Sequence, residues 1–566
     1  MKTFSLILGS VVLAASTVFA CVGDDPANTG SSSGTSGSVP DSGGTSGTSG
    51  TSGTSGTSGT SGTSGTSGDG GATDGAADAA VPGSTQWTLK FDVTTTGTDD
   101  QTRATTLAML ADGSAIIAGF FRGTFVIDGT NLTASGYQDA FIAKISPTGK
   151  RVWSKVLTGG PTNGVTVASI TSLAVTDSNN VIVGAYCTGT CTVDGHASVA
   201  SAGTDSSFVM ELNGSTGAAT WMTTFKAFNG GLTNYASITA VAAHGGTIAV
   251  AGTFGKDVVI DKSPVGVNTS VSVVGSESSV NGVVALLDDN MQGKPTSAVQ
   301  FGGTSAAGTG DSQEYIRSLT YDQQGNLFVA GEFYATKLDG LGLGFTKAAS
   351  ASSEPDTFLA KVSGALVAGN TGAPWGQSFP TPDSSKVFSV HASAVAPTGD
   401  AVFVGEFNTP TTIRNMSSAT VPVGGTDAFL AVVKAGGTGD YFKVYGGAKY
   451  ESATSVAVAP DGDILLAGTY ESPALVLEGT TLPSPGNLNG GFVHLRRKSG
   501  VGHWTVGYAS ASNGEVVNMR AVGVDAMNGR ALAFGDFKGT VNLGAGSVAS
   551  SKSGTKSSAF LVSYVR

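Results

Sequence analysis

The sequence is poor in charged residues, and after residue 85 it contains no long segment with the apolar spacing of an amphipathic helix. Asp, Glu, Lys and Arg together make up 13% of the chain, whereas glycine occurs 84 times. Valine, alanine, threonine and serine supply much of the remainder. This composition is typical of short strands joined by tight turns, and it argues against a mainly helical fold.

Basic residues are also scarce. The chain has 30 Lys and Arg against 41 Asp and Glu, which gives a formal net charge of −11 and a pI near 4.9. A nucleic-acid-binding protein needs a basic stripe that displaces counterions from phosphates. Arg496, Arg497 and Lys498 form one short cluster, which we interpret as a solvated turn. The sequence therefore predicts no nucleic-acid partner.

The N-terminus has the pattern of an export signal. Lys2 precedes an apolar run from Phe4 to Ala20, which is short for a transmembrane helix and fits a signal peptide over residues 1–20. The segment from Val18 to Cys21 resembles a bacterial lipobox, in which the cysteine is acylated. Phe19 is bulkier than that pattern prefers, so ordinary secretion is the alternative to a lipid anchor on Cys21.

Only three cysteines are present, at positions 21, 187 and 191. Cys187 and Cys191 can pair with each other, which leaves Cys21 over, and acylation accounts for this odd cysteine. Export favours oxidation, so we expect a disulfide between Cys187 and Cys191. Free thiols are one alternative. A metal site is another, although zinc would need two further ligands.

Residues 21–84 are predicted to form a disordered linker. The triplet Thr-Ser-Gly repeats eight times from Thr45 to Gly68, and such a segment cannot bury enough apolar surface to offset its ordering entropy. With Cys21 acylated, the linker would join the folded part to a membrane. We expect an exported protein anchored in the cell envelope, at the outer membrane or the cell surface, with secretion as the alternative.

The remaining sequence consists of repeats. One motif ends a strand with Gly, one further residue and an aromatic residue, and it occurs seven times at intervals of 63 to 79 residues. Its glycines are Gly119, Gly184, Gly252, Gly331, Gly405, Gly468 and Gly535. A second strand follows each copy, and a third strand then usually starts with Trp. Each repeat therefore predicts four antiparallel strands, which is the unit of a β-propeller blade.

The two ends of the repeat region complement each other. The last repeat stops at Arg566 without a Trp strand, while Gln86–Phe91 matches that strand and precedes the first repeat. All five tryptophans occupy this one repeat position. The sequence therefore predicts an all-β fold, a seven-bladed β-propeller over residues 85–566. The N-terminal strand would close the last blade, because only a closed ring buries both faces of every blade.

These repeats resemble those of the SBBP-type seven-bladed propeller family. An Asp-x-x-Gly-Asn turn before a Val-x-Gly strand ending is clearest over Leu319–Gly331, and a related turn occupies Ser455–Gly468. The combination of lipobox, low-complexity linker and repeats is also similar to cell-surface propeller lipoproteins of myxobacterial type. The resemblance implies a propeller at the cell surface, and it implies no single activity.

Three residues are candidates for ligand binding. Arg317, His391 and Arg520 occupy similar positions on the innermost strands of the fourth, fifth and seventh repeats, which line the channel of a propeller. Together they could bind an anion or an acidic sugar. The alternative is that they pair with nearby carboxylates such as Glu314. The five histidines are scattered without ligand spacing, and we expect no catalytic residue, metal or cofactor.

The sequence leaves three functions open. The first is a monomeric surface-exposed binding or scaffold module, which contacts a protein or a polysaccharide through loops of the propeller. The second is an extracellular lyase or glycosidase with its site over the channel, although a fold alone does not imply an activity. The third is a purely structural envelope protein. We expect the first, and therefore no enzymatic activity.

Overall fold

The computed structural model describes most of residues 81–566. It leaves out residues 98, 160–165, 199–204, 229–235, 256, 264–270, 275–279, 305–312, 340–342, 348–354, 367–374, 381–386, 418–423, 487–488, 501–502, 510–515, 545 and 550–555. The expected signal peptide, Cys21 and the linker up to residue 80 lie outside the described residues. Within the described part, no helix has the length and hydropathy needed to cross a membrane.

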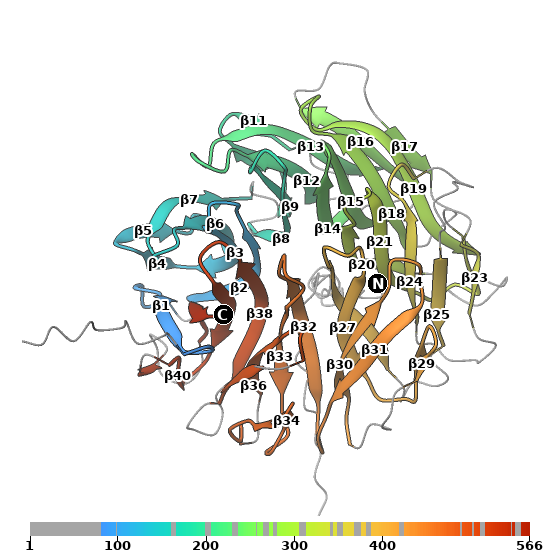
Figure 1. The fold of residues 1–566 in the computed structure, drawn as a ribbon. Coiled ribbons are helices and arrows are strands. Elements are labelled where there is room, and N and C mark those ends of the chain that lie inside the picture. Colours follow the sequence, from blue (N-terminus) through green and yellow to red (C-terminus); the bar gives the residue numbers. More distant parts are fainter. Residues whose placement is uncertain are drawn as a thin grey trace, which may run out of the picture. The chain divides into compact units, whose positions relative to one another are not determined.

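Seven antiparallel sheets of at least four strands follow one another along the chain and are arranged around a common centre (Figure 1). The prediction of an all-β, seven-bladed propeller is confirmed. From the innermost strand outward, blade 1 contains β2 (Gln101–Met109), β3 (Ala115–Arg122), β6 (Asp139–Ile145) and β7 (Arg151–Leu157). Blade 2 contains β8 (Ala168–Val175), β9 (Val181–Thr188), β12 (Asp205–Leu212) and β13 (Ala219–Phe228). Blade 3 contains β14 (Ala236–His244), β15 (Thr247–Gly255), β18 (Val280–Asp288) and β19 (Lys294–Thr304).

The other four blades repeat this order. Blade 4 contains β20 (Glu314–Tyr321), β21 (Asn326–Phe333), β24 (Asp356–Ser363) and β25 (Trp375–Phe379), and blade 5 contains β26 (Phe388–Val395), β27 (Ala401–Phe407), β30 (Asp427–Val433) and β31 (Gly439–Tyr445). Blade 6 contains β32 (Glu451–Val458), β33 (Ile464–Tyr470), β36 (Gly490–Arg496) and β37 (Trp504–Tyr508). Blade 7 contains β38 (Val517–Asp525), β39 (Arg530–Phe537), β42 (Ser558–Val565) and β1 (Thr85–Phe91).

The N-terminal strand completes blade 7, as the repeat pattern predicts. β1 pairs antiparallel with β42, so that Lys90 lies opposite Phe560 and Trp87 lies opposite Ser563. Before β1, the backbone N–H of Gly83 donates to the carbonyl of Val565 at 2.7 Å. The two ends of the repeat region therefore replace the turn that joins the third and fourth strands in the other blades.

The burial of each strand explains its composition. The second and third strands, such as β3 and β6, are almost entirely buried because a neighbouring blade covers each of their faces. Both faces therefore accept Val, Ile, Ala and Phe, and the sequence loses its two-residue alternation. The described core consists of seven apolar clusters, each shared by two adjacent blades, so that stability resides in the junctions between blades.

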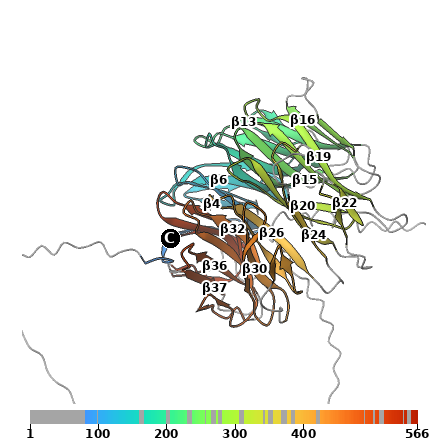
Figure 2. The ribbon, with the colours of Figure 1, turned by 45° about the vertical axis from the view of Figure 1, so that its right-hand side comes forward.

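A short hairpin connects the second and third strands of each blade. Two of these arms extend the outer edge of the preceding blade, because β16 pairs with β13 and β22 pairs with β19. Figure 2 shows β16 beside β13 at the outer edge of the propeller. The arms are β4 (Thr124–Ile127) and β5 (Thr130–Thr133), β10 (Thr192–Val193) and β11 (His196–Ala197), β16 (Asp257–Ser263) and β17 (Val271–Val274), β22 (Lys337–Asp339) and β23 (Phe345–Thr346), β28 (Thr412–Ile413) and β29 (Met416–Ser417), β34 (Val476–Leu477) and β35 (Thr480–Thr481), β40 (Thr540–Asn542) and β41 (Ser547–Ala549).

The recurring glycine of the sequence motif has a steric cause. In every blade the innermost strand carries a β-bulge, and in blade 4 the bulge lies between Ile316 and Ser318. In six blades the bulge directs a carbonyl of the inner strand toward the motif glycine, whereas Gly184 of blade 2 lies against Ile238 of blade 3. A Cβ on Gly331 would lie 2.2 Å from the carbonyl oxygen of Tyr315 and 2.8 Å from the ring of Phe358. Any side chain there would displace the inner strand.

Candidate functional site

The three residues predicted to line the channel share one structural position. Arg317, His391 and Arg520 are the bulged residues of β20, β26 and β38. In the other four blades the equivalent residue is threonine, at Thr105, Thr171, Thr239 and Thr454. The seven innermost strands thus place one bulge residue each around the channel, four of them neutral and three basic or protonatable.

Each arginine of this ring pairs with a carboxylate of its own blade. The Arg317 guanidinium donates to Glu332 at 2.9 Å, and that of Arg520 donates to Asp536 at 3.0 Å. His391 lies 3.2 Å from the carbonyl oxygen of Ala453 in the next blade. The structure therefore brings the three residues to one ring of positions, but it gives each of them its own partner.

The electrostatics of these pairs support a fixed ion-pair network. Burial alone would raise the pKa of Glu332, but the Arg317 guanidinium and a hydrogen bond from Ser389 outweigh it and hold the pKa below its usual range. Asp536 is held low in the same way, against burial, by Arg103 and Arg520. Because these carboxylates stay ionised, they neutralise the cations on which an anion site would depend.

Glu314 is not the partner that the sequence indicates for Arg317. Its side chain is fully buried, and among the described residues neither carboxylate oxygen has a hydrogen-bond partner at normal distance, the backbone N–H of Ala335 giving only a small stabilisation of its charge. Burial raises the pKa of Glu314 to about 8, so the group is mainly protonated at neutral pH. Arg317 therefore finds its counter-charge on the second strand of the blade, at Glu332.

The cysteine pair lies at the arm of blade 2. Cys187 at the end of β9 and Cys191 before β10 are joined by a disulfide, with a Cα–Cα distance of 6.3 Å. Both side chains are fully buried within the cluster between blades 1 and 2. Within the described residues, no group of three or more His, Cys, Asp or Glu side chains could hold a metal ion.

The tryptophans have a structural role that repeats around the ring. Each one lies on the outermost strand of its blade and packs against a glycine with positive φ in a turn of the next blade. At the junction of blades 1 and 2, a Cβ on Gly217 would lie 2.7 Å from the indole of Trp153. The five pairs are Trp87 with Gly149, Trp153 with Gly217, Trp221 with Gly293, Trp375 with Gly437, and Trp504 with Gly83.

The junction of blades 3 and 4 lacks a tryptophan but is filled from the other side. Ser297 takes the tryptophan position, opposite Leu286 in the register. The residue at the turn position that is elsewhere glycine is Leu366, which has a φ of 51° and is 6% exposed. Its side chain joins the cluster of blades 3 and 4. A leucine on one blade thus replaces the indole of the other.

The junction of blades 5 and 6 has neither filling. Tyr441 lies at the tryptophan position, opposite Val432, and the matching turn residue is Gly500 with a φ of 73°. Among the described residues, a Cβ on Gly500 would meet no atom within 4 Å. Beside this turn lies a pocket of about 270 Å³, which Tyr441, Val432 and Lys498 help to line. We call this space the open slot.

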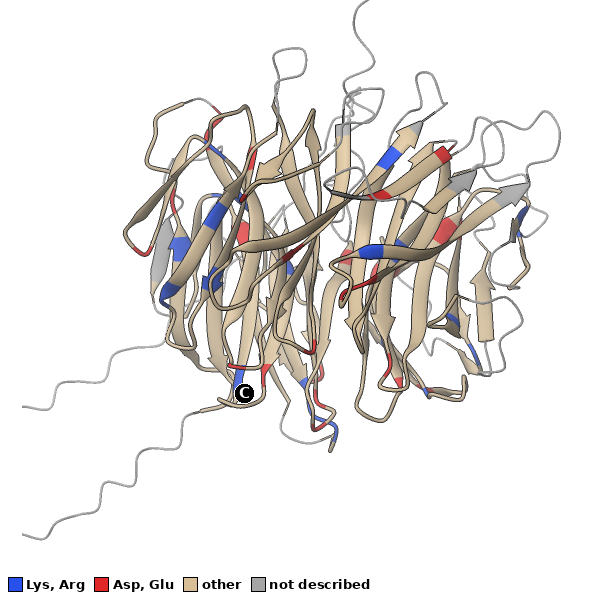
Figure 3. Ribbon diagram, turned by 90° about the horizontal axis from the view of Figure 1, so that it is seen from above, with Lys and Arg blue, Asp and Glu red and all other residues tan. Residues whose placement is uncertain are grey.

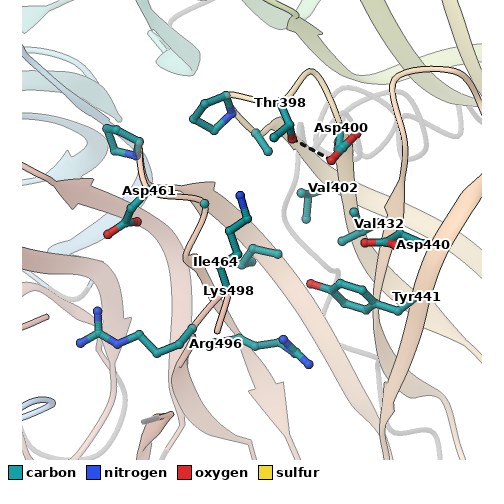
Figure 4. Close-up of a pocket in the computed structure, with 15 residues that line it drawn as sticks. Thr398, Asp400, Val402, Val432, Asp440, Tyr441, Asp461, Ile464, Arg496 and Lys498 are labelled. Atoms are coloured by element: carbon teal, nitrogen blue, oxygen red, sulfur yellow. Dashed lines mark hydrogen bonds between the residues drawn. The ribbon is translucent and has the colours of Figure 1, made fainter. Parts of the chain in front are cut away.

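Charged side chains surround the open slot (Figure 4). The Tyr441 phenol and the Lys498 side chain point into it, between the turns that carry Thr398 and Asp461. The Arg496 guanidinium lies 4.8 Å from the centre of the Tyr441 ring. Burial raises the pKa of Tyr441 to about 12, so the phenol stays protonated and can act as a hydrogen-bond donor.

Two charges of the open slot are left without ion-pair partners. Among the described residues, neither the Asp400 carboxylate nor the Lys498 ammonium has an opposite charge within ion-pair distance. Asp400 accepts hydrogen bonds from the Thr398 hydroxyl at 2.7 Å and from a backbone N–H at 3.0 Å. On the rest of the propeller, acidic and basic residues are interspersed (Figure 3). The open slot is therefore lined by one carboxylate and one ammonium that form no ion pair with each other.

A pair of carboxylates lies at the opposite ends of these two blades. Asp427 of blade 5 is 5% exposed and Glu451 of blade 6 is 1% exposed. Burial, with the charge of Glu451, raises the pKa of Asp427 to about 6. Glu451 accepts backbone N–H bonds from Gly447 and Ser472. With both groups buried and Glu451 used by the backbone, this pair is part of the fold rather than an open acid–base site.

Sequence reasoning missed the open slot, although a signal for it exists. The fifth repeat carries Tyr441 at the position where five other repeats carry Trp. The basic cluster from Arg496 to Lys498, interpreted as a solvated turn, borders the slot. What the sequence did not show is that the tryptophan of each blade packs on the glycine turn of the next one.

The chain is similar to several solved structures, but only at low sequence identity. No family model and no curated protein matches the chain. Solved structures that match include a polysaccharide lyase, Uly1, at 9% identity with a TM-score of 0.40, covering 85% of this chain and 99% of the lyase. A protein of unknown function from Dyadobacter fermentans matches at 11% identity and a TM-score of 0.33, over 85% and 99% of the two chains.

A third similar structure is Drosophila Plexin A in complex with Semaphorin 1b, at 9% identity and a TM-score of 0.29, over 86% and 88% of the two chains. At these identities and TM-scores the matches carry no argument about ligand or activity. The resemblance to SBBP-type repeats is therefore neither supported nor opposed by a family model.

Proposed function

We propose that this chain is an exported, lipid-anchored propeller of the SBBP type, which binds an extracellular macromolecule through the open slot between blades 5 and 6. The observation that carries this proposal is the unfilled junction. Five of the other six junctions are filled by an indole and the sixth by Leu366. A stable ring tends to fill such a space, because each void loses packing energy.

The chemistry of the open slot supports binding. Tyr441 offers an aromatic face and a hydroxyl, while Asp400 and Lys498 offer charges of both signs. A concave site with an apolar wall and a few convergent polar groups is the usual form of a recognition pocket. The channel supports binding less well, because Glu332 and Asp536 already neutralise its arginines.

The lipid anchor and linker expected from the sequence fit the same function. Acylation of Cys21 would hold the chain at a membrane, and the linker of residues 21–84 would let the propeller reach a partner. These two features belong to the proposal, because the described residues do not include them. A binding module at the cell surface has a use for such a tether.

The test is an array of extracellular proteins and glycans probed with the full chain and two variants, Lys498→Glu and Tyr441→Ala. Binding should be lost at least tenfold in both variants and kept by Tyr450→Ala, whose side chain is exposed at a loop away from the slot. Binding that survives both slot variants would refute the site. Turnover of a polysaccharide would instead favour the lyase or glycosidase. If the chain bound nothing on the array, the purely structural role would be favoured.

A further inference from the structure

We propose that the occupant of the open slot is an aromatic side chain, best an indole, supplied by a partner polypeptide. This inference rests on the proposed function and specifies its ligand. It follows from a comparison of the seven junctions between adjacent blades, which have equivalent positions. At five junctions the corresponding space holds a tryptophan that belongs to the chain.

The equivalence of the positions follows from the strand register. Trp153 lies opposite Lys144 on β6, and Tyr441 lies opposite Val432 on β30. In blade 1 the Lys144 ammonium and the Trp153 indole N–H both donate to the carbonyl of Gly214 in the next blade, each at 3.2 Å. In blade 5 both of these side chains are replaced by shorter ones.

The turn of blade 6 keeps the form that receives an indole elsewhere. Gly500 donates its backbone N–H to the carbonyl of Arg497 at 3.0 Å, as Gly149 donates to Ser146 at 3.0 Å beneath Trp87. Both glycines have positive φ and present a flat surface without a Cβ. Trp87 lies against this surface of Gly149, whereas no atom of the described part of the chain lies against that of Gly500.

Two of the five junctions give the indole N–H a backbone acceptor. The Trp87 and Trp153 N–H groups donate to the backbone carbonyls of Pro147 and Gly214. The Trp221 N–H donates to the Asp289 carboxylate, and the N–H groups of Trp375 and Trp504 have no partner among the described residues. Pro147 stands two residues before Gly149, and Lys498 stands at the same place before Gly500. An indole seated in the open slot would therefore find the carbonyl of Lys498 in the corresponding position.

Charge complementarity favours a polypeptide over an acidic polysaccharide. The lining of the slot includes three carboxylates and three cations, which are Asp400, Asp440, Asp461, Arg496, Arg497 and Lys498. A chain of uniform negative charge would therefore meet as many carboxylates as cations. A peptide that carries both charges beside its aromatic residue can match Asp400 and Lys498 together.

The experiment uses N-acetyl-L-tryptophanamide as the probe and measures its binding to the full chain by ligand-observed NMR. We expect saturable binding with a Kd on the order of 1 mM, as befits a small fragment. N-acetyl-L-alaninamide should not bind. Two variants fill the slot from opposite sides, Tyr441→Trp as at five junctions and Gly500→Leu as Leu366 does. Each should weaken probe binding at least tenfold, while Tyr450→Ala should leave it unchanged.

The outcomes separate this inference from the proposed function. The indole assignment is wrong if the probe does not bind, or if it binds both filled variants as well as the natural chain. The proposed function survives that failure where the array still gives a partner that depends on Lys498 and Tyr441. The Tm of each variant shows whether it is folded. A correctly seated indole in Tyr441→Trp should raise Tm. A lower Tm in both variants would also count against the slot being shaped for a ring.

Discussion

The filling of the blade junctions predicts a specific cost for Trp153→Tyr, which gives the junction of blades 1 and 2 the tyrosine found between blades 5 and 6. The indole of Trp153 is 8% exposed and lies against Gly217. Its loss removes one hydrogen bond to the carbonyl of Gly214, which contributes about 1 kcal/mol net. That carbonyl still accepts from Lys144, so it is not left unpaired.

The smaller ring adds a packing term to this cost. Tyrosine cannot cover the surface of Gly217 that the second ring of the indole covers, and the remaining void costs about 1 to 2 kcal/mol in lost burial and contacts. We therefore expect the free energy of unfolding to fall by about 2 to 3 kcal/mol. Urea denaturation followed by circular dichroism should show an earlier midpoint with an unchanged slope.

The reverse exchange at the other junction is the control. Tyr441→Trp should raise the free energy of unfolding by about 1 kcal/mol, because it adds buried ring surface to an unfilled space. Leu366→Gly should cost about 2 to 4 kcal/mol, since it empties the junction of blades 3 and 4. If Trp153→Tyr and Leu366→Gly both cost less than about 0.5 kcal/mol, the junctions do not depend on these fillings.

Three further predictions concern other parts of the fold. Gly331→Ala should cost about 1 to 3 kcal/mol by overpacking against Tyr315 and Phe358, whereas Gly436→Ala, with open space around it, should change the urea midpoint little. Asp427→Asn should make the protein more stable at pH 7 than the natural chain. Because the folded pKa of Asp427 is raised to about 6, the natural protein loses stability as pH rises from about 4 to 6, so the two proteins should converge below pH 4 in thermal melts. Phe91→Ala should cost about 3 to 5 kcal/mol, because this ring is 1% exposed within the cluster of blades 7 and 1; an unchanged Tm would show that β1 does not belong to that core.

The repeat pattern was enough to predict the ring because it records packing directly. The glycine of each motif occurs where the inner strand has its bulge, and each tryptophan occurs where its blade contacts the next blade. Position on the inner strand could likewise be predicted for Arg317, His391 and Arg520, since they recur in phase with the repeat. Their counter-charges could not, because Glu332 and Asp536 stand on other strands, 15 and 16 residues along the chain.

The open slot shows where sequence reasoning stops. Tyr441 in place of Trp is a conservative change when read alone, and Leu366 gives no sign of replacing an indole. Their meaning depends on Gly500 and on the turn of the next blade, more than 50 residues away from Tyr441. A vacancy is a property of two blades together, so it becomes visible only when the register of both is known.

Hydrogen exchange at the N-terminal strand tests the closed ring most directly. β1 is joined to the rest of the ring mainly by its pairing with β42, in which Leu89 lies opposite Leu561. In the native full chain, those amides of residues 87–91 that donate to β42 should exchange as slowly as the amides of residues 558–565, within about tenfold, whereas the alternate amides on the outer edge should exchange faster. Exchange of residues 87–91 at the rate of an unstructured segment, with 558–565 still protected, would contradict closure by the two ends of the repeat region.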